Sequence, residues 1–383
     1  MSAPAPLVAA SLLDRLAGAQ VVVCAGPGGV GKTTTAAALA LALAGRGRRV
    51  AVVTIDPARR LADALGVGTL GNDPVPVAPG TLAALGVAPP GELWAMMLDP
   101  KLTFDGLVAE LAPDPQRREA VLANPIYRQI STAAGGSHEF TAVARLHDLD
   151  RDPRFDVVVL DTPPSRNALD FLDAPDRIAG FLEGRAVQAL LGQGRTGIAA
   201  RVARRGTNLA LGGLRRLTGV EVLEQLATFL AVLGPLTDGF AARAAAVRAL
   251  LRAPTTRFVV VTGPGPVPAG EAIFFRRHLQ AVGMPFTALV VNRVTVLDPA
   301  SGDGDGGAVG ARLAPALGAP LAAKVGRTWD DHRRLAARDA EAVARLSAAT
   351  GDPTPVVVPM LDHEVFDLPA LAAIRDALLA PRS

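Results

Sequence analysis

The sequence predicts an α/β fold built on a doubly wound, mainly parallel sheet. Short apolar runs rich in valine recur along the 383 residues, and longer helical patterns separate them. Runs without polar alternation are typical of strands that are covered on both faces. Strands that alternate with helices indicate a parallel sheet. The expected strands are residues 20–25, 49–55, 93–98, 156–160, 257–262, 287–292 and 355–359.

The predicted domain organisation follows from the one long segment in which strand-like runs and helical patterns do not alternate. We expect a single domain over residues 1–383 with a helical insertion at about residues 174–252, where amphipathic helical patterns occur and no strand-like run is present. Such an insertion usually packs on its own domain, but it can also form a groove for a partner. The Gly/Asp stretch at residues 301–310 is predicted to be a flexible surface loop.

Composition excludes several classes of function. The formal net charge is only +3 and no five-residue basic run occurs, so nucleic acid is not an expected partner. Cys24 is the only cysteine, which excludes an intrachain disulfide and a cysteine-based zinc site. The N-terminus does not have the pattern of a signal peptide, and no apolar run approaches the roughly 20 residues of a transmembrane helix. The sequence therefore predicts a soluble, cytoplasmic protein with no transmembrane segment.

Residues 26–34 carry the strongest motif, G-x-x-x-x-G-K-[ST], between a predicted strand and an Ala/Leu-rich helix. The glycines allow backbone N–H groups to surround phosphate oxygens, and the helix N-terminus adds its positive dipole end. Lys32 is expected to reach the β- and γ-phosphates of ATP, and the Thr33 hydroxyl to ligate Mg²⁺. The predicted nucleotide-binding residues of this phosphate loop are Gly28, Gly29, Val30, Gly31, Lys32, Thr33 and Thr34.

The same letters also fit a dinucleotide fingerprint. Gly26, Gly28 and Gly31 satisfy G-x-G-x-x-G, and Asp56 ends the next strand, where a dinucleotide fold places its ribose-binding acid. That alternative predicts a nicotinamide or flavin oxidoreductase. The Gly-Lys-Thr triplet at the helix start is the more specific signal and favours the phosphate loop.

Two aspartates end valine-rich strands, Asp56 after the second strand and Asp161 after the fourth. An Asp at such a position in a phosphate-loop enzyme holds Mg²⁺, often through water. For either residue alone, a helix cap or a turn is an equally good interpretation. Both together, downstream of the phosphate loop, favour a nucleotide site.

These motifs resemble those of the arsenical-pump ATPase and tail-anchored-protein-targeting ATPase family, which belongs to the deviant Walker A class. GGVGKTT matches the family's phosphate loop, DPARRLADALG its first switch and DTPPSRNALDFLDAP its second switch. LVVNRV and VVVPMLDHEVFDLPAL resemble its late nucleotide-site strands. Residues 96–108 and 124–149 look like the versions found in actinobacteria. The resemblance covers nearly the whole chain and implies a fold of the P-loop NTPase type.

The resemblance also implies roles for single residues. Asp56 would polarise the attacking water, and Asp161 would support Mg²⁺ and couple the γ-phosphate to the second switch. Asn292 would recognise adenine, and Glu139 would sense the switch state. The closing loop of Pro359, Met360 and Leu361 would flank the base.

Three departures from the family pattern bear on function. The family's loop begins Gly-Lys-Gly-Gly, and that first lysine reaches the partner's nucleotide across a dimer, whereas Pro27 stands here. Cys24 alone cannot bind arsenite as the pumps do, and the paired zinc cysteines of the eukaryotic targeting factors are absent. The pump resembles two fused halves, whereas this chain has one nucleotide site.

The sequence therefore predicts a Mg²⁺-dependent ATPase that couples nucleotide state to a protein partner or an apolar cargo. We expect a homodimer or a heterodimer with a paralogous ATPase, with a hydrophobic protein as a possible cargo. The alternative is a nucleotide-binding subunit with little turnover of its own that works in a heterodimer, and Pro27 is the feature that supports it.

Overall fold

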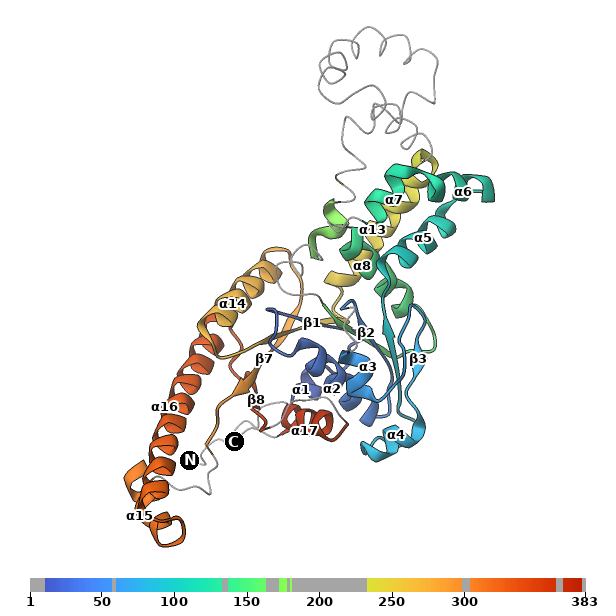
Figure 1. Cartoon of the computed structure of the whole chain (residues 1–383). Helices are drawn as coiled ribbons and strands as arrows, with labels where there is room; N and C mark the ends of the chain where they lie inside the picture. The colour runs from blue at the N-terminus through green and yellow to red at the C-terminus, as the bar shows by residue number, and fades with distance from the viewer. Residues whose placement is uncertain are drawn as a thin grey trace, which may run out of the picture.

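The computed structural model describes residues 11–56, 60–132, 137–162, 172–177, 180, 233–297, 304–362 and 368–380. Within them, one sheet has the strand order β3-β4-β2-β5-β1-β6-β7-β8 (Figure 1). Every adjacent pair is parallel except β3 with β4. The strands are β1 (Val21–Ala25), β2 (Arg49–Thr54), β3 (Val75–Pro76), β4 (Glu92–Met97), β5 (Val157–Asp161), β6 (Thr256–Thr262), β7 (Phe286–Val294) and β8 (Val356–Pro359).

The predicted fold class and all seven predicted strands are confirmed. The edge strand β3 was missed because it is two residues long and contains Pro76, so it carries no apolar run. Its antiparallel pairing with β4 closes one edge of the sheet.

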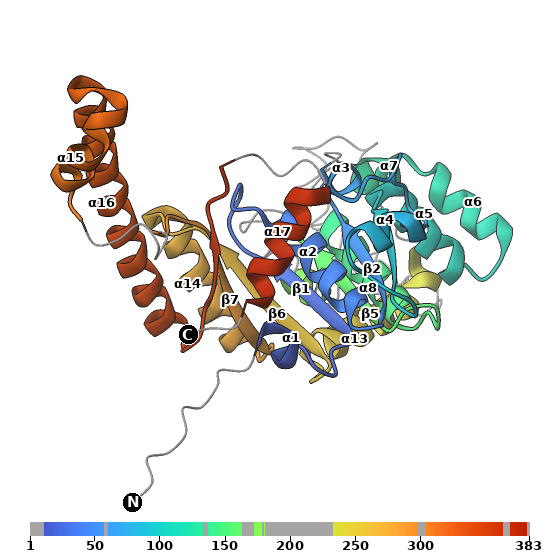
Figure 2. The ribbon, with the colours of Figure 1, turned by 90° about the horizontal axis from the view of Figure 1, so that it is seen from below.

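Helices cover both faces of the sheet, as the unbroken apolar strands require. One face packs against α1 (Leu12–Arg15), α2 (Lys32–Gly45), α3 (Arg60–Leu65), α4 (Pro79–Ala84) and α17 (Leu368–Leu379). Figure 2 shows α2 and α17 crossing this face together. The other face packs against α8 (Ser137–Asp150), α13 (Thr237–Arg252), α14 (Pro266–Ala281) and α16 (Ala319–Thr350).

A second, smaller core lies among helices beyond the sheet (Figure 1). Its aromatic centre includes Phe104 stacked on Tyr127, with ring centroids 5.6 Å apart. The elements are α5 (Pro100–Leu111), α6 (Pro115–Ala123), α7 (Pro125–Thr132), the 3₁₀ turn η1 (Gly234–Leu236) and parts of α8 and α13. Of the insertion predicted at residues 174–252, α13 therefore packs on this helical core together with α5–α8. Residues 178–179 and 181–232 of that prediction lie outside the described residues.

The predicted surface loop at residues 301–310 is wrong for its second half. Gly306 begins α15 (Gly306–Leu317), which Asp305 caps by accepting the Ala308 N–H at 2.8 Å. The glycines here serve packing rather than flexibility. A Cβ on Gly306 would lie 2.1 Å from the Gly326 carbonyl oxygen of α16, so the two helices touch through bare backbone. Residues 301–303 lie outside the described residues.

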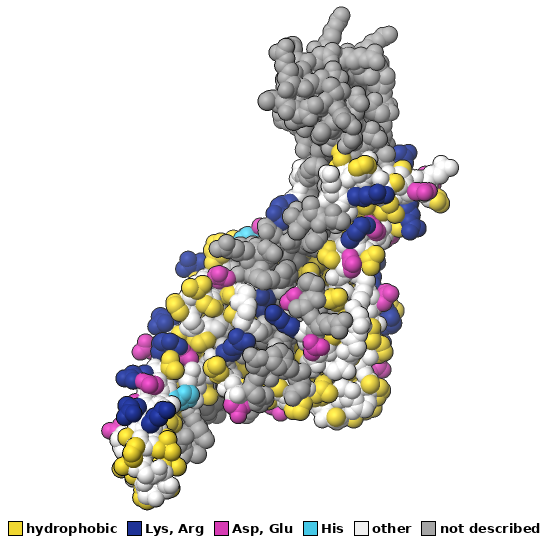
Figure 3. All heavy atoms as spheres, in the orientation of Figure 1, with side chains coloured by type: hydrophobic (Ala, Val, Ile, Leu, Met, Phe, Trp, Pro, Cys, Tyr) yellow, Lys and Arg dark blue, Asp and Glu magenta, His cyan; other side chains and the backbone are white. Residues whose placement is uncertain are grey.

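Together α15 and α16 form an arm that extends beyond the sheet (Figures 1 and 2). With 32 residues, α16 is about 48 Å long at 1.5 Å per residue. Figure 3 shows basic side chains along it and hydrophobic ones toward the end of the arm, where Leu317 and Leu321 are exposed. No helix among the described residues is long and apolar enough to cross a membrane.

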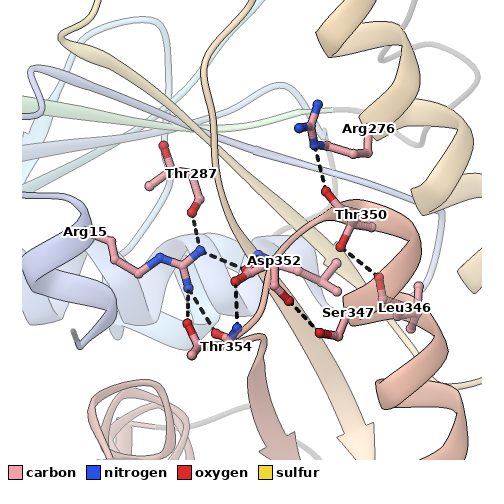
Figure 4. Close-up of polar contacts among 9 residues, drawn as sticks. Arg15, Arg276, Thr287, Leu346, Ser347, Thr350, Asp352 and Thr354 are labelled. Atoms are coloured by element: carbon pink, nitrogen blue, oxygen red, sulfur yellow. Dashed lines mark hydrogen bonds and ion pairs between the residues drawn. The ribbon is translucent and has the colours of Figure 1, made fainter. Parts of the chain in front are cut away.

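A buried ion pair fastens the base of the arm to the sheet (Figure 4). Asp352 is 1% exposed and accepts from Arg15 of α1 at 2.8 Å. Its carboxylate also accepts the backbone N–H groups of Leu289 in β7 and Thr354. Arg15 in turn donates to the Thr287 and Thr354 carbonyls. This one contact therefore joins α1, β7 and the turn between α16 and β8.

Candidate nucleotide site

The predicted site residues meet at one edge because the carboxyl ends of parallel strands lie side by side. Strand β1 ends at Ala25 and leads through residues 26–31 into α2. Asp161, at the end of β5, lies opposite Cys24 of β1 in one direction and Thr54 of β2 in the other. The phosphate loop and both strand-end aspartates are therefore brought together, as predicted.

Two glycines of the phosphate loop are fixed by close contacts. Gly26 has φ 150°, and a Cβ there would lie 1.9 Å from the Val261 carbonyl oxygen of β6. Gly31 has φ 90°, and its Cβ would lie 2.4 Å from Nδ2 of Asn292. A side chain at Gly26 would collide with the backbone of β6, and one at Gly31 would have to displace the Asn292 amide at a φ that is unfavourable for any residue with a Cβ. Both glycines of the G-x-x-x-x-G spacing therefore have a steric role in this site.

Side-chain donors engage the carbonyl groups of the loop. Lys32 Nζ donates to the Pro27 oxygen at 2.8 Å. Asn292 Nδ2 donates to the Val30 oxygen at 2.8 Å. Arg293 donates to the Gly29 oxygen at 3.1 Å. With these carbonyls satisfied by the protein, the loop's amides are the backbone groups left to bind an anion.

Asp161 is the most buried carboxylate of the site, at 2% exposure. Its Oδ2 accepts the Thr33 hydroxyl at 2.6 Å and the Thr54 hydroxyl at 2.9 Å. Burial raises its pKa to about 6, although both hydroxyls and the Lys32 charge oppose the rise. Its Oδ1 is buried and has no hydrogen-bond partner. A buried carboxylate oxygen without a donor, beside a threonine hydroxyl, fits a hard oxygen-seeking cation such as Mg²⁺.

Lys32 is buried at the start of α2. Burial lowers its pKa, and the charges of Asp161 and Asp56 counteract this. Its ammonium donates to one carbonyl of the loop, that of Pro27, among the described residues, and an anionic ligand in the loop can replace that contact. No cluster of three or more His, Cys, Asp or Glu suitable for a metal occurs in the described part of the chain. A cation here would depend on Thr33, Asp161 and the ligand's own oxygens.

Asp56 lies two residues beyond the end of β2 and is half-buried. Its backbone N–H donates to the Thr54 hydroxyl at 3.2 Å, and that hydroxyl donates on to Asp161. Arg60 lies 3.9 Å from its carboxylate. The ends of the two predicted switch strands are thus connected through Thr54. Residues 57–59 and 163–171 of the predicted switches lie outside the described residues, as does the side chain of Glu139 in α8.

The predicted base-binding residues lie on the opposite side of the phosphate loop from Asp161, as the strand order β2-β5-β1-β6-β7-β8 dictates. Asn292 is buried in β7 and its amide is already joined to the loop. Pro359 pairs with Val294, and the Met360 N–H donates to the Val294 oxygen at 2.9 Å. Met360 is 65% exposed, while Leu361 packs partly against the core.

Sequence reasoning missed two residues of this site. Thr54 could have been found, because it lies at the carboxyl end of β2, two residues before Asp56. Parallel strands end at a common edge, so Thr54 lies beside Asp161 of the neighbouring β5. Arg293 gave no signal beyond its place beside Asn292, since its contact with the loop depends on a backbone φ of 60°.

A model of the anion-transporting ATPase family matches residues 19–305, from the strand before the phosphate loop to beyond β7. The chain belongs to this family. The match includes every part of the site except the loop of Pro359, Met360 and Leu361, and it confirms the predicted family. It gives no support to the oxidoreductase alternative.

Individual anion-transporting ATPase relatives are distant. ATPase GET3 of Malassezia globosa is 32% identical over 154 residues, which is 40% of this chain and 42% of that protein. ATPase ARSA1 of Chlamydomonas reinhardtii is 26% identical over 287 residues, 70% of this chain and 34% of that protein. ATPase get3 of Schizosaccharomyces pombe is 30% identical over 174 residues, 45% and 48% of the two chains. The matched segments span less than half the length of each relative.

Proposed function

We propose that the chain is a Mg²⁺-dependent ATP-binding and ATP-hydrolysing switch protein. The observation that carries this proposal is the network of Thr33, Asp161 and Thr54 at the first turn of α2. It places an unpartnered carboxylate oxygen beside a phosphate loop in which the carbonyls of Pro27, Gly29 and Val30 are already engaged. Membership of an ATPase family supports the same activity.

The residues divide the work by position. Thr33 and Asp161 would hold Mg²⁺, which supplies positive charge to the phosphate oxygens. Lys32 would exchange the Pro27 carbonyl for the β- and γ-phosphates. Asp56, less buried and next to Asp161, would orient and polarise the attacking water. Asn292 would recognise adenine through its Oδ1, which accepts only the Arg293 N–H within the described residues and has room for a second donor.

Two substitutions test the activity. Lys32→Ala removes a buried cation and should weaken Mg·ATP binding on the order of 10- to 100-fold. The exposed arm variant Lys324→Ala is the matched control and should bind like the wild type. Equal hydrolysis by Lys32→Ala and the wild type would rule out the phosphate-loop assignment.

Asp56→Asn keeps the side-chain shape and removes its charge. Binding should persist while turnover falls on the order of 10²- to 10⁴-fold, as for loss of a proton acceptor. Calorimetric binding and phosphate release, measured on one preparation, separate the two effects. If binding is lost together with turnover, Asp56 is a ligand or a structural residue instead.

For assembly, we propose a dimer, and Pro27 favours a heterodimer with a paralogous ATPase over a homodimer. A homodimer of this chain would lack the family's trans-acting lysine at both sites, and with it part of the transition-state stabilisation. Arg60 is exposed beside Asp56 and could substitute, as could Arg59 and Arg166, which lie outside the described residues. An arginine fork differs from a lysine tip in reach and geometry.

Pro27→Lys tests this assembly proposal. The isolated wild type should hydrolyse ATP slowly, and Pro27→Lys should raise turnover in a concentration-dependent manner. Fast wild-type hydrolysis that Arg59→Ala, Arg60→Ala and Arg166→Ala each leave unchanged would show that no trans-acting charge is missing.

The cargo proposal concerns residues 174–252. We propose that this segment contacts a protein partner or an apolar cargo in response to nucleotide state. Hydrogen exchange with and without an ATP analogue can decide, and identical exchange throughout the segment would count against the role. The cytoplasmic location expected from the sequence stays a prediction.

A further inference from the structure

Arg293 has a backbone conformation that its position in a strand does not explain. Its φ is 60°, and it is the only non-glycine residue with positive φ in the described part of the chain. The left-handed region is unfavourable for a residue with a Cβ, and such strain persists only where the surroundings enforce it. Here the Arg293 N–H donates to Oδ1 of Asn292 at 3.0 Å, and the pairing of β7 with β8 shifts register between Val291 and Val294.

The strained backbone places the side chain over the phosphate loop. The guanidinium donates to the Gly29 oxygen at 3.1 Å, and the side chain is exposed. Within the described residues, no carboxylate forms an ion pair with it, in contrast to Arg15, Arg49 and Arg243, which each have one. The planar guanidinium of Arg293 is therefore held at one edge by the Gly29 carbonyl. Because the side chain is exposed, the face of the guanidinium is accessible to a ligand in the site.

The position of Arg293 in the sheet determines which part of a bound nucleotide its guanidinium can contact. The metal-binding end of the site, at Asp161 in β5, lies on one side of β1, and Arg293 in β7 lies on the other side. Phosphates bound in the loop leave the ribose and the base to extend toward β7 and β8. On that side, Arg293 is next to Asn292, and Met360 is joined by its N–H to Val294.

We propose that Arg293 stacks its guanidinium on the purine base of the bound nucleoside triphosphate. This inference rests on the proposed ATP site and adds a residue to it. Stacking uses the face of the guanidinium, whereas the hydrogen bond to Gly29 uses its edge, so both contacts coexist. A guanidinium over an aromatic ring gains from the ring's negative face. Since every purine offers such a face, Arg293 contributes affinity, and the choice between adenine and guanine rests with groups in the base plane.

The test compares two ligands that share phosphates and differ in the base. Binding of Mg·ATP and of Mg·tripolyphosphate is measured by calorimetry on the full chain. Arg293→Ala should weaken ATP binding about tenfold and leave tripolyphosphate binding within about twofold. Arg293→Lys keeps the charge without the plane and should lie between. The exposed Arg312→Ala in α15 is the control and should match the wild type for both ligands.

Arg293→Gly separates the side chain from the backbone. Glycine adopts φ 60° without strain, so this variant should be at least as stable as Arg293→Ala in thermal unfolding. It should nevertheless show the same selective loss of ATP affinity. It also keeps the test decisive if Arg293→Ala folds poorly.

Three outcomes would overturn the inference. Equal loss for both ligands would make Arg293 a brace of the loop or a phosphate contact. If neither ligand binds more weakly to the variants, Arg293 does not contribute to nucleotide binding. If the wild type binds neither ligand, the proposed function is wrong, and this inference falls with it. If the wild type binds both ligands and the variants keep the same ratio of ATP affinity to tripolyphosphate affinity, only this inference is wrong.

Discussion

Asp161→Asn should make the ligand-free protein more stable while disabling the proposed metal site. The fold raises the pKa of Asp161 from 3.8 to about 6, chiefly by burial. A difference of roughly two pKa units corresponds to about 3 kcal/mol. Asparagine cannot ionise, and its carbonyl oxygen can still accept the hydroxyls of Thr33 and Thr54.

The sign of the pH dependence follows from the direction of that pKa shift. Below about pH 4 the carboxyl group is protonated in both the folded and the unfolded state, and the pKa shift has no effect on stability. Between about pH 4 and pH 6 the unfolded state ionises first, so the wild type loses stability as the pH rises. Above about pH 6 the loss is complete. The stability of Asp161→Asn relative to the wild type should therefore increase by about 1.5 kcal/mol between pH 5 and pH 8.

Urea unfolding with EDTA and without nucleotide, at pH 5 and pH 8, measures this difference. Thr54→Val is a second variant, because it removes a hydroxyl that lowers the pKa of Asp161, and it should move the wild-type transition to higher pH. In parallel, Mg²⁺ should no longer enhance ATP binding by Asp161→Asn. A stability difference between Asp161→Asn and wild type that stays constant from pH 5 to pH 8 would refute the reasoning.

Three further predictions concern the Arg15–Asp352 ion pair, the contact between α15 and α16, and Cys24. Arg15→Ala should lower the free energy of unfolding by about 3–5 kcal/mol in urea, because it leaves Asp352 buried without its cation; a loss below 1 kcal/mol would show that the backbone donors suffice. Gly306→Ala should destabilise the protein by about 1–3 kcal/mol through overpacking at the α15–α16 contact, whereas Gly270→Ala, in the open part of α14, should be neutral or stabilising. Arsenite should not stimulate hydrolysis, since Cys24 is fully buried and burial raises the pKa of its thiol; a saturable stimulation that survives Cys24→Ser would contradict this.

The sheet could be predicted from the sequence because a strand covered on both faces must be apolar throughout. Each of the seven apolar runs, six of them containing valine, became a strand for that reason. The two failures, β3 and α15, share a cause. Each depends on contact with another element: β3 pairs with the edge that β4 offers, and α15, which Asp305 caps locally, packs on α16 where Gly306 and Gly326 let the two helices meet. Local composition indicated a loop where tertiary packing produced a helix.

Within the site, a residue's role could be predicted when it depends on neighbouring residues in the sequence or on a general rule of parallel sheets. The phosphate loop is one continuous segment, and its spacing specifies its geometry. The pairing of Thr33 with Asp161 needed only the rule that parallel strands end at a common edge. Thr54 was overlooked although the same rule places it at this edge, opposite Asp161. Arg293 could not be assigned in this way, since its contact with the loop depends on an unusual φ.

Pro27 changes the loop in two ways that act in the same direction. It replaces a residue that would carry a cation in the family pattern, and it has no backbone N–H. In a homodimer each site would therefore receive one positive charge fewer from the facing loop. The loop of each chain also has one amide fewer of its own to set against the phosphates. Lys32 donates to the Pro27 carbonyl, so part of the charge that remains is engaged until a ligand displaces that contact. Positive charge missing from the loop must come from Mg²⁺, from arginines near the switches or from a second chain. Binding and slow turnover by the isolated chain, with acceleration by a partner, is the behaviour that this distribution of charge favours.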